Sequence, residues 1–345
     1  MKYSFIIASY NRLEEIKELL LSAEQLDFER PEFEIVISDD GSKDGTGEFI
    51  QQYQSPSGLQ LLYIHQENKG PGEARNHGMR NAHGDFFIFI DSDCMFPPDY
   101  LRRVDNHLQQ QPLDAFGGPD TCHPSFSPLL KAINYSMTSF IGTGGTRGSK
   151  KSVSKKFYPR SFNMGIRRTI FEKIGGMGAL RHGQDMEYSS RIYNNGYNVG
   201  LIPDAFVYHK RRTSLKRFFK QVFNWGVTRI NLGKIDKAML KPVHFLPLLI
   251  VLGLIFVLLI TPLLFVFIPI LGYIIWGIII LGLATIKFIA FFQSLAKYKN
   301  FKVSVLSIIT LYIQIFAYGL GMMSGLWQSF RGKSTATGFS KNYYK

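Results

Sequence analysis

Residues 86–93 read Phe86-Phe87-Ile88-Phe89-Ile90-Asp91-Ser92-Asp93. Five consecutive large apolar residues are typical of a strand that is buried on both faces of a parallel sheet. Asp91 and Asp93 follow this run directly, and because they are one residue apart, their side chains are expected to face the same way. The sequence therefore predicts two carboxylates at the carboxyl end of a buried strand, where open α/β sheets bind their ligands.

Short apolar runs of the same kind recur earlier in the chain, separated by amphipathic helical patterns. The predicted strands are 2–8, 33–38, 59–65 and 86–90. In the first intervening segment Leu13, Ile16, Leu19 and Leu20 recur at helical spacing, and residues 72–83 favour a helix before the fourth strand. Alternation of strand and helix predicts an α/β fold with a doubly wound sheet.

The last third of the chain differs sharply in composition from the rest. The chain has a formal net charge of +14, yet residues 243–345 contain no Asp or Glu, and residues 243–286 contain no charged residue at all. About 20 apolar residues cross a bilayer, so this segment fits two spans with a turn within 261–269. We predict membrane helices over 243–263, 266–286 and 303–327. A purely soluble enzyme and a disordered or fibrous chain are excluded.

The predicted topology leaves one question open. No cleavable signal peptide is recognised, so the first domain, residues 1–210, is expected in the cytosol of a multi-pass cell-membrane protein. A hairpin returns Lys287 and the nearby lysines to that side, as the positive-inside rule prefers. A third full span would place the basic tail, residues 331–345, outside, against the rule. The last apolar segment is therefore either a span or partly interfacial. Cys94 and Cys122 are expected as free thiols rather than a disulfide.

Two further segments have a distinctive composition. Residues 211–242 are strongly basic with interleaved aromatic side chains, which favours an interfacial helix that contacts anionic lipids, although a solvated helix packed on the core fits as well. Residues 142–156 are rich in Gly, Ser and Lys and are expected to form a loop. Helices are expected after Asn163 and over 184–195.

Two polar motifs accompany the acids of residues 91–93. Residues 38–46 read Ser-Asp-Asp-Gly-Ser-Lys-Asp-Gly-Thr at the end of the second predicted strand, and residues 68–76 read Asn-Lys-Gly-Pro-Gly-Glu-Ala-Arg-Asn after the third. Acids and glycines at such turns suit a nucleoside, and basic residues suit a diphosphate. Taken singly, each motif is equally compatible with an ordinary polar turn.

Together with Ala8-Ser9-Tyr10-Asn11-Arg12, these motifs resemble the family 2 glycosyltransferases in order and spacing over residues 2–209. The resemblance implies an inverting enzyme with the nucleotide-diphospho-sugar transferase (GT-A) fold. It also implies a division of roles among the candidate residues. The nucleotide-binding residues would be Ser9, Tyr10, Asp39, Asp40, Lys69, Arg75 and Asp91, with Asp40 at the base.

The same resemblance assigns the remaining site. Asp93 would bind Mn²⁺ or Mg²⁺, and His209 either joins it as a ligand or is structural. Asp185 would be the general base that deprotonates the acceptor hydroxyl. The residues that would lie near the donor sugar and acceptor are Asn163, Gln184 and Trp225. Gln184 departs from the family, which usually has Glu there.

A second departure bears on the product. Polymer synthases of the family carry Gln-x-x-Arg-Trp, and the corresponding segment here is Gln221-Val222-Phe223-Asn224-Trp225, without the Arg. The resemblance therefore implies transfer of a single sugar from a nucleotide sugar, with UDP favoured, to a lipid-linked or cell-envelope glycan. The alternatives are a processive polysaccharide synthase and a non-catalytic basic membrane protein. No nucleic-acid partner is expected, because the positive charge gathers beside the predicted spans.

Overall fold

The computed structural model describes residues 1–143, 157–180, 182–211 and 213–332. The chain divides into two compact units. The described part of the first covers 1–123, 157–180 and 182–210, and that of the second covers 124–143, 211 and 213–332. Residues 124–143, which we had assigned to the first domain, thus belong to the second unit. Most of the loop expected over 142–156 and most of the basic tail lie outside the described residues.

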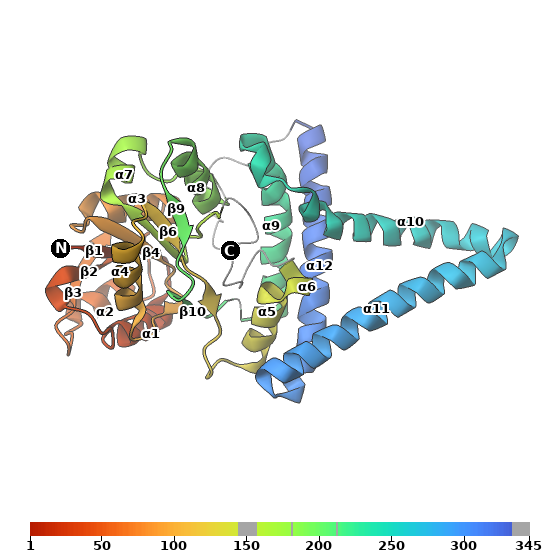
Figure 1. Cartoon of the computed structure of the whole chain (residues 1–345), viewed down its shortest axis with the longest axis horizontal. Coiled ribbons are helices and arrows are strands. Elements are labelled where there is room, and N and C mark those ends of the chain that lie inside the picture. Colours follow the sequence, from red (N-terminus) through yellow and green to blue (C-terminus); the bar gives the residue numbers. More distant parts are fainter. Residues whose placement is uncertain (144–156, 181, 212, 333–345) are drawn as a thin grey trace. The chain divides into compact units, whose positions relative to one another are not determined.

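A seven-stranded sheet forms the centre of the first unit (Figure 1). Its order is β3 (Gln60–His65), β2 (Phe33–Asp39), β1 (Tyr3–Ser9), β4 (Phe86–Ile90), β8 (Asn163–Arg167), β6 (Ala115–Gly117) and β9 (Val199–Leu201). The first four of these are mutually parallel and agree with the predicted strands to within one residue at each end. The α/β fold class is confirmed.

The sheet is mixed, because β8 runs antiparallel to both of its neighbours, β4 and β6. The helix expected directly after Asn163 is therefore wrong for residues 163–167, and α7 (Arg168–Ile174) begins only afterwards. Position 165, in the middle of β8, has no room for a side chain. A Cβ on Gly165 would lie 2.1 Å from the ring of Phe116. Such a short strand with Gly at its centre lacks the apolar run that identified the others.

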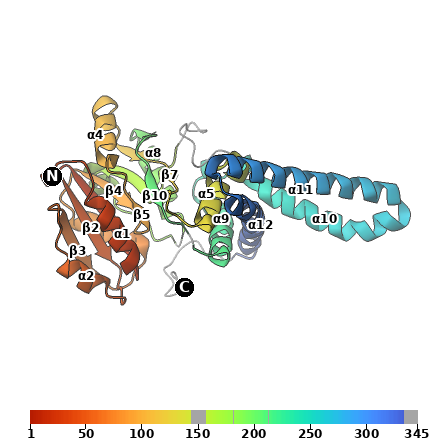
Figure 2. The same cartoon turned by 90° about the horizontal axis from the view of Figure 1, so that it is seen from below.

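Helices cover both faces of the sheet (Figure 2). On one face α1 (Leu13–Ala23), α2 (Thr46–Gln52) and α4 (Tyr100–Gln110) pack against Phe5 and Ile7 of β1. On the other, α3 (Pro71–Asn81), α7 and α8 (Gln184–Asn194) form a core with Ile6. Successive residues of β1 thus enter different cores, which is why its central residues, Phe5 to Ala8, are all apolar. A short 3₁₀ turn, η1 (Arg30–Glu32), precedes β2.

A second, three-stranded sheet lies in the same unit. It consists of β5 (Cys94–Met95), β10 (Val207–His209) and β7 (Asp120–Thr121), with β10 in the middle. Its register pairs His209 with Cys94 and Val207 with Asp120. Three segments that are far apart in the chain therefore meet directly after β4.

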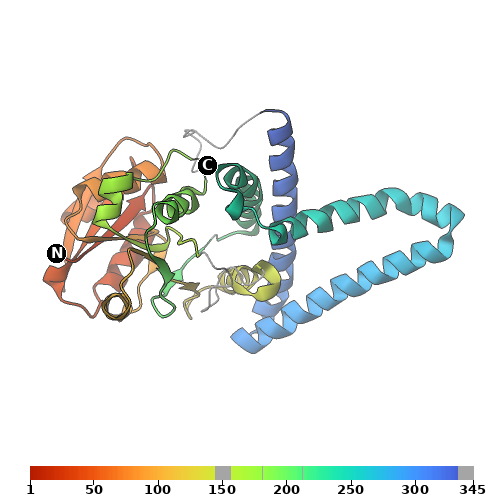
Figure 3. The ribbon, with the colours of Figure 1, turned by 45° about the horizontal axis from the view of Figure 1, so that its top comes forward.

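The second unit is helical. It contains α5 (Pro128–Thr138), α6 (Phe140–Thr143), α9 (Leu215–Ile235), the 3₁₀ turns η2 (Lys237–Met239) and η3 (Pro242–Phe245), α10 (Leu246–Phe267), α11 (Pro269–Tyr298) and α12 (Phe301–Phe330). Helices α10 and α11 meet at Ile268 and diverge toward α12, which lies across their open end (Figures 1 and 3).

Three helical segments are long and apolar enough to cross a membrane: Pro242–Phe267, Pro269–Tyr298 and Phe301–Phe330. They contain the spans predicted from composition, except that α11 begins only at Pro269 and continues through Lys287 and Lys297 to Tyr298. The three segments differ in how much of their apolar surface the protein buries. Only 6% of the most apolar window is buried in each of the first two, against 44% in the third.

Helix α9 packs closely along the second half of α12. A Cβ on Gly321 would lie 2.0 Å from the carbonyl oxygen of Phe223, and one on Gly226 would lie 2.3 Å from that of Tyr318. Phe218 and Val222 of α9 share a buried cluster with Ala317 of α12. The two backbones approach each other because both helices carry glycine at the crossing.

We predict that Gly321→Ala lowers the thermal unfolding temperature of the detergent-purified protein. The added methyl has no room at the crossing, and overpacking of this kind costs about 1–3 kcal/mol. Gly277→Ala in α11 is the matched control, since a Cβ there meets nothing within 4 Å, and Ala is favoured over Gly in helices by about 1 kcal/mol. Equal or higher stability of Gly321→Ala would contradict the packing described.

Candidate active site

The predicted site residues of β1 and β2 lie at the carboxyl ends of these strands. Asp40 is fully buried, and its carboxylate accepts hydrogen bonds from the backbone N–H groups of Lys69 and Gly70, each at 2.8 Å, and from Gln66 at 2.7 Å. Asp40 thus fixes the loop that begins after β3. The Lys69 side chain is exposed.

Asp39 has a different set of partners. One carboxylate oxygen accepts from the Ser42 N–H at 2.9 Å, and the other accepts from the Tyr63 hydroxyl at 2.8 Å. Burial, and then this hydrogen bond, raise the pKa of Tyr63, so the phenol stays protonated as the donor. Asp39 therefore joins the turn after β2 to β3. Tyr10, another residue predicted to bind the nucleotide, lies half-buried just beyond β1.

Arg75 of α3 and Asp91 form an ion pair of 2.6 Å across the end of β4. Both had been predicted to bind the nucleotide, and the structure brings them into contact. The Arg75 Nε and the Ser9 Oγ are buried, and neither has a hydrogen-bond partner within the described part of the chain. Buried polar atoms without partners are costly in a protein interior, so these two atoms mark a place at this edge of the sheet where a partner is missing from the described residues.

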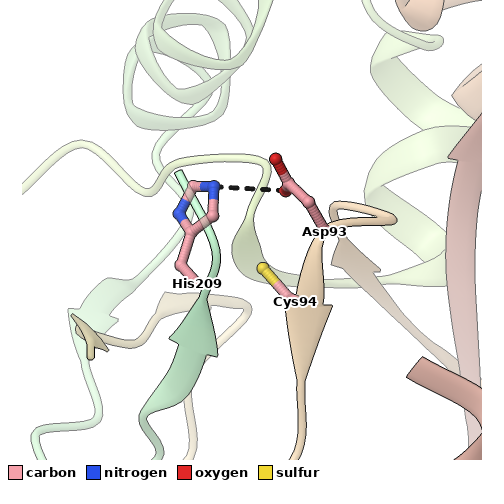
Figure 4. A group of neighbouring side chains, drawn as sticks. All are labelled: Asp93, Cys94 and His209. Carbon is pink, nitrogen blue, oxygen red and sulfur yellow. Dashed lines mark ion pairs between the residues drawn. The ribbon is translucent and has the colours of Figure 1, made fainter. Parts of the chain in front are cut away.

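Asp93 and His209 lie side by side, joined by an ion pair of 3.2 Å between Oδ1 and Nε2 (Figure 4). The opposite ring nitrogen of His209, Nδ1, lies 3.2 Å from the Asp120 carboxylate on β7. Burial alone would lower the pKa of His209, but the carboxylates of Asp93 and Asp120 outweigh it and raise that pKa to about 9. The imidazole is therefore held between two acids.

The same place offers ligand atoms for a divalent metal. Among the described residues, Asp93, Cys94 and His209 each present a ligand atom within 4.8 Å of the others. Burial, with the nearby Asp93, raises the pKa of the Cys94 thiol well above its usual value; its sulfur lies 3.8 Å from the Phe162 carbonyl oxygen, as a protonated donor would. A carboxylate and an imidazole remain. The carboxylate suits Mn²⁺ or Mg²⁺, whereas the imidazole is a ligand typical of transition metals.

Asp185 and Gln184 begin α8, directly after Gly183, whose φ of +79° glycine adopts without strain. Asp185 is half-buried, and its Oδ2 accepts from the Ser161 N–H at 3.3 Å. The Gln184 amide lies against the start of α3, since a Cβ on Gly72 would be 2.4 Å from its Nε2. These contacts join the start of α8 to the segment just before β8 and to the helix that carries Arg75.

Two residues predicted to lie near the donor sugar and acceptor, Asn163 and Trp225, are not at this edge of the sheet. Asn163 is fully buried, and its amide is used inside the fold: it accepts from the Tyr100 hydroxyl and donates to the carbonyls of Pro119 and Ala205. It ties three segments together and has no surface to offer a substrate. Trp225 lies on α9 in the second unit and packs beside Ile133.

Asp120 is the residue that sequence reasoning missed. It stands 27 positions after Asp93 and 89 before His209, and nothing local distinguishes it from other loop acids. Only the register of the three-stranded sheet brings it to His209. Gln66, which binds Asp40, was also missed.

Comparisons with known proteins identify the family and the fold. Residues 4–175, about half of the chain, match the family model described as glycosyl transferase family 2. Glycosyltransferase AglE of Haloferax volcanii is 26% identical over 252 residues, which are 72% of this chain and 80% of AglE. The poly(ribitol-phosphate) β-N-acetylglucosaminyltransferase TarS of Staphylococcus aureus is 37% identical over 221 residues, 61% of this chain, and the match spans only 35% of TarS.

Among solved structures, the mannosyltransferase PcManGT of Pyrobaculum calidifontis, in complex with GDP-Man and Mn²⁺, aligns with a TM-score of 0.61. It is 18% identical, and the alignment covers 95% of this chain and 87% of that one. At that identity the likeness concerns the fold, which is of the GT-A type. By its family match, its relatives and this fold, the chain belongs to the family 2 glycosyltransferases.

Proposed function

We propose that the chain transfers a single sugar from a nucleotide sugar, a UDP-sugar in first place, to a lipid-linked or cell-envelope glycan with inversion at the anomeric carbon. The observation that carries this is the Asp93–His209 pair. It joins the second acid of the Asp-Ser-Asp motif to a distant histidine, just beyond the strand whose end also holds the Arg75–Asp91 pair.

The nucleotide would bind over the ends of β1, β2 and β4. Ser9 Oγ and Arg75 Nε, buried without partners in the described chain, are suited to meet its polar groups. Asp40 would face the base, although the loop after β3 already occupies part of its hydrogen-bonding capacity. Each carboxylate oxygen has more than one lone pair, but Asp40 is fully buried, so the loop after β3 would have to move for the base to reach it.

Asp93 and His209 would hold the metal, with the Cys94 thiol left protonated. A Mn²⁺ or Mg²⁺ ion there would supply positive charge to the departing diphosphate. Asp120 would act as a positioning residue. By accepting a hydrogen bond from the Nδ1–H of His209, Asp120 would orient the ring so that the Nε2 lone pair faces the metal.

Asp185 would take the proton from the acceptor hydroxyl as its oxygen attacks the anomeric carbon and the bond to the diphosphate breaks. The Ser161 N–H would hold one carboxylate oxygen in place. Asn163 is left out of the substrate-contacting set, because both of its amide N–H groups donate to the carbonyls of Pro119 and Ala205 and its amide oxygen accepts from Tyr100. Asn224 in place of the Arg of polymer synthases supports single addition.

The three apolar helices support a membrane-bound enzyme whose acceptor is presented at the membrane. TarS, by its name, transfers N-acetylglucosamine to poly(ribitol-phosphate), so N-acetylglucosamine donors and phosphate-containing envelope polymers come first in a panel of substrates. More than one sugar added per acceptor would favour the processive alternative.

Titration of the purified full-length protein with UDP, GDP, dTDP and CMP, with and without Mn²⁺, tests the donor site. We expect one nucleoside diphosphate to bind in a Mn²⁺-dependent way, and Asp93→Asn to abolish the Mn²⁺ dependence by removing a ligand charge. Asp27→Asn is the control, since that acid forms a surface pair with Arg102. Metal-independent binding that is equal in wild type and Asp93→Asn would refute the metal site.

Asp185→Asn tests the general base. Loss of a base costs about 10²–10⁴-fold in rate, so we expect kcat to fall at least 100-fold with the donor Kd unchanged. The exposed acid Glu172 of α7 supplies the control, Glu172→Gln. Turnover of Asp185→Asn within a few fold of wild type would remove Asp185 from the chemistry.

Asp120→Ala tests the positioning role. Loss of such an outer partner lowers metal affinity about 10–100-fold, which Mn²⁺ titration by electron paramagnetic resonance measures without turnover. Asp120→Asn keeps an acceptor and should recover part of the loss. Asp105→Asn alters another buried acid, the acceptor of the Tyr3 hydroxyl, and should leave Mn²⁺ affinity unchanged. Equal affinity in Asp120→Ala and wild type would contradict the assignment.

A further inference from the structure

Helix α12 is apolar enough to cross a bilayer, but its surroundings within the second unit point elsewhere. We propose that α12 lies along the membrane surface beside α9, with both of its ends on the same side, and that α10 and α11 alone enter the hydrocarbon. The surface that contacts lipid headgroups and the outer acyl chains would then be one side of α12. This goes beyond the proposed function and does not depend on it.

The exposed surface of α12 is a single stripe. Its exposed large apolar side chains are Phe301, Val305, Ile309, Met323, Leu326, Trp327 and Phe330. At 100° per residue these positions fall within a sector of about 100°, continued by the half-buried Tyr312 and Phe316. The stripe is interrupted at the buried Gly319, where α12 packs against Pro247 and Val251 of α10. The other sides of α12 are buried or half-buried. An apolar stripe along one side suits a helix lying in the interfacial plane.

Helix α10 has the opposite character. Its exposed apolar residues include Leu246, Leu249, Leu252, Ile255, Leu258 and Phe265, which spread over about 260° around the axis at 100° per residue. A helix that is apolar all round is suited to immersion in the bilayer. The two helices of similar apolar composition thus present different surfaces, and only α10 and α11 present one that lipid can surround.

The neighbour of α12 carries charges that a spanning helix would take into the bilayer. Arg229 of α9 donates from Nε to the Tyr318 hydroxyl at 3.3 Å, and Tyr318 is close to the midpoint of α12. Lys216, Arg217 and Lys220 of α9 are exposed, on the turns around Phe218, which packs in one cluster with Ala317. If α12 crossed, these four cations would lie at the depth of the hydrocarbon core, where charged side chains are strongly disfavoured.

The glycine contacts prevent α9 from escaping that depth. Gly226 and Gly321 hold the two backbones together at the crossing, so α9 and α12 must enter or avoid the bilayer as a pair. At the surface, the basic side chains of α9 meet anionic headgroups instead. The arrangement also removes the conflict with the positive-inside rule, because Lys299 and Arg331, at the two ends of α12, then share one side.

Cysteine accessibility in sealed membranes tests sidedness. The parent is Cys122→Ser, in which Cys94 stays buried, and it measures background labelling by a membrane-impermeant maleimide. Lys299→Cys and Gly332→Cys report the two ends of α12, and Ile268→Cys reports the α10–α11 turn. We expect the cysteines at positions 299 and 332 to be labelled from the same side of the membrane, and the cysteine at position 268 to be labelled from the opposite side. Labelling of 332 from the side of 268, opposite 299, would overturn the proposal.

Depth along the helix gives a second, independent readout. Residues 305 and 330 are about 37 Å apart in a helix, more than the roughly 30 Å hydrocarbon core. Spin labels at Val305, Ile309, Met323 and Phe330 should therefore show nearly equal depth by oxygen and nickel relaxation. Labels at Leu249, Phe256 and Leu263 of α10 are the control and should show a gradient. A gradient through the bilayer centre along α12 would contradict an in-plane helix.

Discussion

Burial of β1 and β4 on both faces is the constraint on which the rest of the first unit depends. Phe5 and Ile7 enter one core while Ile6 enters the other, so a polar side chain inside either strand needs a partner within the fold. Ser4 of β1 has one, because its hydroxyl donates to Glu34 of β2. The other polar groups lie where the strands end. For that reason Ser9, Asp39 and Asp91 gather at one edge of the sheet, each just as its strand emerges from the core.

That edge is then built from pairs rather than single residues. Arg75 meets Asp91, Asp93 meets His209, and His209 meets Asp120. Each acid that the strand ends supply has a basic or donating partner from another segment, which balances charge in a half-buried place. The diphosphate of a nucleotide sugar carries two negative charges, so together with a divalent metal it would add no net charge to such an edge.

The sequence predicted well what is local and poorly what is paired at long range. Residues 86–90 are apolar without interruption and could be only a buried strand, so the acids after them were placed correctly. The five residues of β8 have Gly165 at their centre and carry no such pattern, and they were misread as the approach to a helix. Asn163 matched a motif, but only packing reveals that its amide is consumed by Tyr100, Pro119 and Ala205. Asp120 has no local signature, since its partner stands 89 residues later.

The contact between Gly72 and Gln184 has a consequence for how this site can change over time. Any side chain at position 72 would collide with the amide of residue 184, so the two positions are free to vary only together. Glutamate and glutamine have nearly the same shape, so the acid usual in the family would fit at 184 beside Gly72 without new room. Exchanging the two residues at 184 therefore leaves the packing unchanged and alters a single charge at the start of α8.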